Sequence, residues 1–70
     1  MVEVCAEIVA NVWKVVAQEG DVVKEGDTIV ILESMKMEIP VVAEEPGTVT
    51  HIKVAEGDVV REGDLIAVIE

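Results

Sequence analysis

A chain of 70 residues makes one small domain, spanning residues 1–70, with no room for a second. Fifteen acidic against five basic residues give a formal net charge of −10, which disfavours nucleic acid and anionic membranes as partners and predicts a monomer in solution. The single cysteine, Cys5, excludes an internal disulfide framework. Since no signal-peptide pattern or membrane-length apolar run is found, we expect a soluble, cytoplasmic protein.

The kind of apolar residue predicts the fold class. Sixteen valines and seven isoleucines stand against two leucines, with no Phe or Tyr and a single tryptophan, Trp13. β-Branched side chains lose little freedom on a pleated sheet and more in a helix. No segment combines helical apolar spacing with a start cap and a stop glycine. We therefore expect an all-β domain, with Trp13 in its core or at its rim.

The chain contains an internal duplication. Residues 1–33 align without a gap with residues 38–70, and 14 of the 33 pairs are identical, so each half is one structural unit. In each half an apolar segment is followed by two Gly-Asp turns, where glycine can adopt the positive φ that other residues resist. Each half then ends in a strand-like run, at 28–33 and at 65–70.

The strands themselves carry two further predictions. The apolar alternation slips by one position near Trp13-Lys14 and again at His51, which predicts a β-bulge in each half. Pro40 has no backbone N–H group, so its strand should lie at a sheet edge or at a gap in the ladder.

The duplication also predicts where the seam lies. Two half-domains that cannot bury their apolar faces alone indicate a sandwich or flattened barrel with a pseudo-two-fold axis. Four residues have no counterpart in either half: Ser34, Met35, Lys36 and Met37. The axis relates this seam to the place where the chain termini meet. We therefore expect an exposed hairpin at one end of the domain and both termini at the other.

Lys36 is the first candidate for chemistry. A lysine in a turn is most often a solvated charge. Here, however, the central pair of the turn is Met35-Lys36, where hairpins normally use Asn, Asp or Gly because φ is positive. Methionines at an exposed tip are hydrated rather than packed. Either another molecule recognises the tip, or Met35 and Met37 fold back onto the sheet. The residues alone leave both possibilities open.

Other kinds of chemistry are disfavoured. One Cys, one Ser and one His, at positions 5, 34 and 51, suggest neither a nucleophilic triad nor a zinc site. Four aspartates occupy symmetric turn positions, which indicates turn formation rather than acid–base catalysis or calcium binding. These aspartates are Asp21, Asp27, Asp58 and Asp64. We expect no catalytic residue and no metal site, so the chain itself should not be an enzyme.

The stretch between the halves resembles the attachment motif of biotinyl domains, the biotin carboxyl carrier branch of the biotinyl/lipoyl family. The motif reads Glu33-Ser34-Met35-Lys36-Met37-Glu38. The resemblance spans the chain and includes Gly-Asp-x-Val-x-x-Gly-Asp at 20–27 and 57–64, and Pro46-Gly47-Thr48-Val49. It implies a flattened barrel of two four-stranded antiparallel sheets with the lysine on a protruding hairpin. No extra segment interrupts residues 18–28, so the thumb loop of some bacterial carriers should be absent.

The resemblance implies a carrier. A biotin protein ligase would attach biotin to the ε-amine of Lys36, and Glu33, Ser34, Met35 and Met37 would form the hairpin that the ligase recognises. The biotinylated lysine would then act as a swinging arm between a biotin carboxylase and a carboxyltransferase, as in an acyl-CoA carboxylase. The chain resembles the short free-standing biotinylated proteins of actinobacteria, although a carrier domain of a larger carboxylase fits the same residues.

Two other functions stay open. Lipoyl domains share the fold and the hairpin lysine, but they usually carry Asp-Lys-Ala where this chain has Met35, Lys36 and Met37, which favours biotin. The second alternative is an unmodified interaction module that uses the acidic surface. In that case Lys36→Arg should be harmless.

Overall fold

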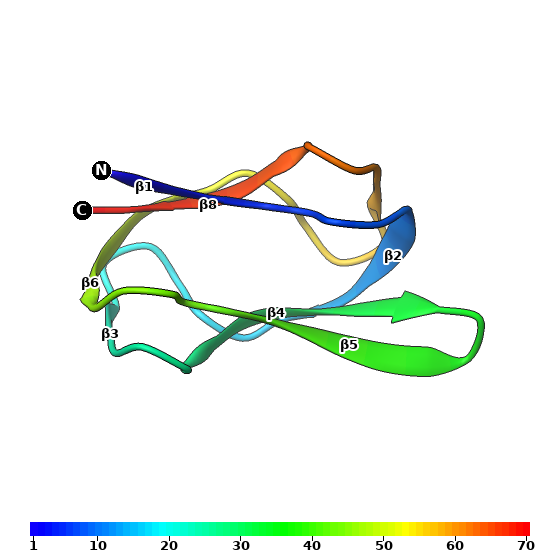
Figure 1. Ribbon diagram of the computed structural model, residues 1–70, viewed down its shortest axis with the longest axis horizontal. Coiled ribbons are helices and arrows are strands. Elements are labelled where there is room, and N and C mark those ends of the chain that lie inside the picture. Colours follow the sequence, from blue (N-terminus) through cyan, green and yellow to red (C-terminus); the bar gives the residue numbers. More distant parts are fainter.

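The computed structural model describes residues 1–70 and contains eight β-strands. The strands are β1 (Val2–Cys5), β2 (Ala10–Val15), β3 (Val22–Val23), β4 (Thr28–Ser34), β5 (Met37–Val42), β6 (Gly47–Ile52), β7 (Val59–Val60) and β8 (Leu65–Ile69). They form two four-stranded antiparallel sheets, ordered β1-β8-β6-β3 and β5-β4-β2-β7 (Figure 1). The expected all-β fold is confirmed. No helix long and apolar enough to cross a bilayer is present.

The two halves of the sequence are related by a pseudo-two-fold axis. Strands β1 to β4 correspond to β5 to β8, so the axis exchanges one sheet order for the other. Hydrogen bonds obey the same two-fold symmetry. The N–H of Gly20 donates to the carbonyl oxygen of Val49 at 2.7 Å, and the N–H of the equivalent Gly57 donates to the carbonyl oxygen of Val12 at 2.9 Å. Each half therefore supplies strands to both sheets, and neither half could form its core alone.

The Gly-Asp pairs form turns, as predicted. Four glycines adopt φ values between 89° and 96°, namely Gly20, Gly26, Gly57 and Gly63. The aspartate after each glycine accepts a hydrogen bond of 2.9 Å on its Oδ2 atom from the backbone N–H three residues earlier. The donors are Gln18, Lys24, Ala55 and Arg61. Side-chain closure of a turn by aspartate is a local backbone role and needs no ligand.

Both predicted β-bulges are present. The register between β2 and β4 shifts between Val12 and Lys14, and that between β6 and β8 shifts between Val49 and His51. The extra residue in each bulge changes which face the following side chains occupy. Pro40 lies in β5, which is an edge strand of its sheet, as its missing N–H group predicts.

Branched aliphatic side chains fill the space between the sheets. Eight of them are almost completely buried: Val12, Ile29, Val30, Leu32, Val49, Val60, Ile66 and Ile69. No polar or charged residue is buried. Full burial of each such side chain stabilises the fold by about 1.5–3 kcal/mol, so the core needs no polar network.

Trp13 lies outside this core, at the rim. Its side chain is 40% exposed, and the Nζ atom of Lys14 lies 4.8 Å from the centre of the indole ring. This distance is within the range of a cation–π contact, which at an exposed site contributes about 0.5–1 kcal/mol.

The domain is elongated, with extents of 31 × 17 × 17 Å. The β4–β5 hairpin protrudes at one end, and both termini lie at the other (Figure 1). The termini are held together because β1 pairs with β8, with Val2 opposite Ile69. The predicted positions of the seam and the termini are thereby confirmed.

Candidate functional site

Lys36 occupies the second position of a two-residue hairpin turn. Strands β4 and β5 pair as far as Ser34 and Met37, which leaves only Met35 and Lys36 between them. Their φ angles are 51° and 65°, so both residues adopt the left-handed conformation that a type I′ turn requires. These are the only residues other than glycine with positive φ in the chain.

The residues of the hairpin are energetically unfavourable for the conformation that it adopts. A non-glycine residue in the left-handed region is unfavourable by about 1–2 kcal/mol, and the turn contains two of them. One position further from the tip, Glu33 lies directly opposite Glu38, and like charges in cross-strand pairs are destabilising. Departures from local preference that cluster in one place are typical of functional sites.

The side chains at the tip point into solvent. Met35 is 91% exposed and Met37 is 60% exposed, and Lys36 is exposed as well. The reading in which the methionines fold back onto the sheet is therefore wrong. Their apolar surface is hydrated, so its burial against another molecule that contacts the tip would be favourable.

The turn rests on a rigid base. Strand β4 is flanked by β5 on one side and β2 on the other, and the pairing with β2 extends as far as Glu33, opposite Asn11. The side chain of Leu32 is buried in the core, four positions before Lys36. The amine of Lys36 is thus held on a short turn at the end of a central strand. A primary amine in this position can be acylated by a bulky partner without disturbing the core.

The other chemistry-bearing residues lie elsewhere. Cys5 and His51 are exposed on β1 and β6, in the sheet opposite to the one that carries Ser34. The Nδ1 atom of His51 lies 3.1 Å from the Oγ1 atom of its neighbour Thr50. No group of three or more His, Cys, Asp or Glu residues is placed to hold a metal ion.

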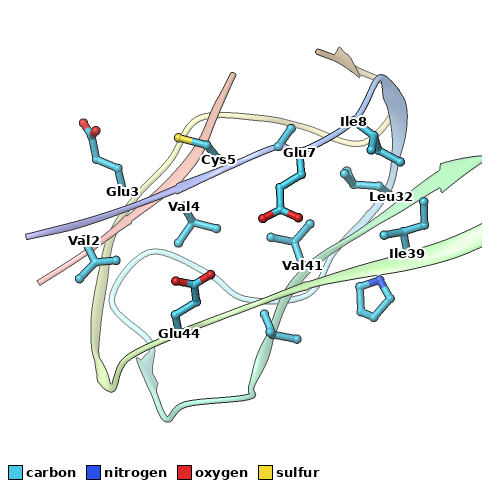
Figure 2. A pocket seen from close by; sticks show the side chains of 13 residues that line it. Val2, Glu3, Val4, Cys5, Glu7, Ile8, Leu32, Ile39, Val41 and Glu44 are labelled. Atoms are coloured by element: carbon cyan, nitrogen blue, oxygen red, sulfur yellow. The ribbon is translucent and has the colours of Figure 1, made fainter. Parts of the chain in front are cut away.

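A groove that sequence analysis did not predict opens between β1 and β5 (Figure 2). Its volume is about 410 Å³, and nine of its thirteen lining residues are hydrophobic. Val4 and Val41 face it from the two strands, and the carboxylates of Glu7 and Glu44 point into it from opposite sides (Figure 2). The duplication pairs Val4 with Val41 and Glu7 with Glu44, but an alignment does not show that the two strands face each other across a groove.

Several known proteins are similar to this chain. The "Biotinylated protein TB7.3 homolog" of Mycolicibacterium smegmatis is 68% identical over 41 residues, which are 59% of this chain and 58% of that protein. The match thus spans little more than half of that relative.

Solved structures agree in fold. The urea carboxylase of Kluyveromyces lactis superposes with a TM-score of 0.93 and 42% identity, over 99% of this chain and 6% of the carboxylase. The lipoyl domain of the 2-oxoglutarate dehydrogenase complex of Azotobacter vinelandii gives a TM-score of 0.76 and 25% identity, over 96% of this chain and 95% of that domain.

The sequence profile of one family covers almost the whole chain. Residues 3–69 match the biotin/lipoyl family, which is described as "Biotin-requiring enzyme". The hairpin lysine, the duplicated fold and this match agree, and the chain belongs to the biotin/lipoyl family.

Proposed function

We propose that this chain is a biotin carboxyl carrier domain, with biotin joined through an amide to the Nζ atom of Lys36. The observation that carries the proposal is the position of this lysine. It is exposed in the left-handed turn at the tip of a rigid hairpin, between two exposed methionines. A carrier needs its attachment point accessible to large enzymes and fixed to a scaffold that does not deform.

The residues of the tip fit such a group. Amide formation consumes the carboxyl group of biotin and removes a proton and the positive charge from the amine of Lys36. The apolar side chains of Met35 and Met37 lie beside the attachment point, where an aliphatic chain can contact them. When bound, biotin supplies a ureido nitrogen that can take up and release a carboxylate. The chain itself positions the group and supplies no acid or base.

A biotin protein ligase is the proposed modifying enzyme. The ligase could recognise the two exposed methionines, the small side chain of Ser34 and the acidic pair Glu33 and Glu38. The unfavourable turn supports this role, because a more stable sequence such as Asn-Gly would remove both the lysine and the apolar surface.

The proposed partners are a biotin carboxylase, which would load the carboxylate, and a carboxyltransferase, which would pass it to an acceptor such as an acyl-CoA. The urea carboxylase of Kluyveromyces lactis supports this proposal, since 6% of that long chain has the same fold as the present domain. Tethering the reactive group to a small mobile domain raises its local concentration at both active sites.

Intact mass after incubation with a biotin protein ligase, biotin and ATP provides the test. The wild-type chain should gain the mass of one biotinyl group, and Lys36→Arg should gain none. Lys53→Arg is the matched control, because it removes another lysine of the chain and should leave the mass gain unchanged. Modification that persists in Lys36→Arg would reject the proposal. So would loading by a lipoate ligase with lipoate but not by a biotin ligase, an outcome that would assign the chain as a lipoyl domain.

A further inference from the structure

We infer that the groove between β1 and β5 is a docking site for the chain's own biotinylated Lys36 side chain. The inference rests on the proposed attachment at Lys36. It concerns where the arm lies when no partner enzyme holds it.

An apolar path leads from the hairpin tip into the groove. Alternate residues of a strand share one face, so Met37, Ile39 and Val41 of β5 lie in a row. Ile39 and Val41 are partly buried against the core and line the groove, whereas Met37 is 60% exposed outside it. Met37 therefore continues the apolar lining of the groove toward Lys36, and an aliphatic arm that follows this row stays in contact with apolar surface.

The reach of the arm matches the length of the path. The lysine side chain, the amide and the valeryl chain together contain roughly 11 bonds of about 1.5 Å, which in extended form span about 14 Å from the Cα atom of Lys36. Strand rise is about 3.3 Å per residue, so Ile39 lies roughly 10 Å and Val41 roughly 17 Å along β5 from Lys36. The biotin rings would thus lie between these two residues.

The groove offers suitable chemistry at this distance. Ile8, Leu32 and Ile39 line the end of the groove nearer the hairpin, and the side chain of Ile8 is 40% exposed, so apolar surface is available there (Figure 2). The carboxylate of Glu7 points across the groove toward Val41 (Figure 2). The sulfur-containing ring of biotin is apolar, and its ureido ring carries two N–H donors. A carboxylate accepts such donors in charge-assisted hydrogen bonds.

Size and tethering also favour docking. A volume of about 410 Å³ lies within the range of roughly 300–1,000 Å³ that is typical of small-molecule sites. A group held by a short flexible link has an effective concentration of the order of millimolar, so an intrinsic dissociation constant in the millimolar range is enough to populate the docked state about half of the time.

The pseudo-symmetry supplies a matched control. Glu44 corresponds to Glu7 and also points into the groove, but it lies eight residues from Lys36, beyond the end of β5. Val42, the last residue of β5, already lies roughly 20 Å along the strand from Lys36 at about 3.3 Å per residue, beyond the reach of the arm, and Glu44 follows it. Glu7→Ala and Glu44→Ala remove the same group from equivalent, exposed positions of the fold, and only the first should affect docking.

Isotope-filtered NMR tests the inference on isotopically labelled protein that carries unlabelled biotin. We expect nuclear Overhauser effects from biotin ring protons to the methyl groups of Ile8 and Ile39, and amide shift changes at Glu7 relative to the unmodified chain. Glu7→Ala should reduce these effects at least threefold, and Glu44→Ala should leave them unchanged. Shift changes confined to residues 34–38, or equal losses in both variants, would overturn the inference. Intact mass, measured on the same samples, separates a failure of docking from a failure of biotin attachment.

Discussion

Gly47 lies directly against Glu70: a Cβ atom at position 47 would be 2.7 Å from the carbonyl oxygen of Glu70 and 2.7 Å from the Cγ2 atom of Ile69. The contact is so close because the last residue of the chain completes the sheet. The N–H of Thr48 donates to the carbonyl oxygen of Glu70 at 2.7 Å, and the N–H of Glu70 donates back to Thr48 at 2.9 Å. The absence of a side chain at Gly47 thus allows β6 to hold the C-terminal end of the chain.

Gly47→Ala should therefore destabilise the domain. Its new methyl group meets backbone and a fully buried side chain, neither of which can move away cheaply, so we expect the free energy of unfolding to fall by about 1–3 kcal/mol. Urea denaturation followed by circular dichroism measures this change. The symmetry-related position is Ala10, which already carries a Cβ atom. If Gly47→Ala were as stable as the wild type, the close contact with Glu70 would not exist in solution.

A different effect is expected at Gly57. Its φ is 93°, and a Cβ atom there would have nothing within 4 Å, so the barrier to substitution is conformational rather than steric. Gly57→Ala should lower the free energy of unfolding by about 1–2 kcal/mol. D-Alanine favours positive φ, and a synthetic chain with D-alanine at this position should be at least as stable as the wild type. Equal losses with both enantiomers would show that the space around Gly57 is restricted.

Much of this structure could be predicted from the sequence because the duplication constrains it. The gap-free alignment of residues 1–33 with 38–70 predicted the symmetry, and hence the opposite positions of the hairpin and the termini. The positive φ of Met35 and Lys36 followed from the number of unmatched residues, since a four-residue insertion between paired strands leaves a two-residue turn.

The contacts between elements could not be predicted in this way. The groove depends on how closely the edges of β1 and β5 approach, which is decided by packing between the sheets and not by the pattern of either strand. The sequence left open whether Trp13 lies in the core or at the rim. Trp13 lies at the bulge of β2, where the alternation of the strand does not determine which face a side chain occupies. The hydrogen bond from the N–H of Ile52 to the Oε2 atom of Glu19, 3.0 Å long, joins residues far apart in sequence and breaks the symmetry. No local signal identifies such a pair.

The pair Glu33 and Glu38 leads to a prediction about salt. Because the two carboxylates lie directly opposite each other, Glu38→Gln should raise the free energy of unfolding by about 0.2–1 kcal/mol at low ionic strength. The gain should largely disappear in 1 M salt, where the Debye length is about 3 Å. Glu62→Gln changes the net charge equally without an opposing carboxylate across a strand pair, so it serves as the control. An equal gain in both variants would attribute the effect to the overall charge of −10.

Variants of the turn test whether the stability of the fold and the attachment of biotin make opposite demands on residues 35 and 36. Met35→Asn combined with Lys36→Gly places the residues preferred in a type I′ turn at φ angles of 51° and 65°. Asparagine keeps a Cβ atom and glycine loses more conformational freedom on folding, so only part of the cost of the two left-handed residues is recovered. The free energy of unfolding should rise by about 1–2 kcal/mol, which for a domain of this size corresponds to an increase in Tm of roughly 4–15 °C. The same variant should accept no biotin.

Two single substitutions separate the contributions. Met35→Asn alone should give part of the stabilisation while Lys36 remains available, so its loading rate reports how strongly the ligase depends on Met35. Lys36→Gly alone should be stabilised but unloadable. Thermal unfolding and intact mass on the same three proteins complete the comparison. If the double variant were less stable than the wild type, the methionine and lysine side chains would have to make stabilising contacts in solution. The exposed tip would then be a structural element, and its turn residues would no longer indicate a function.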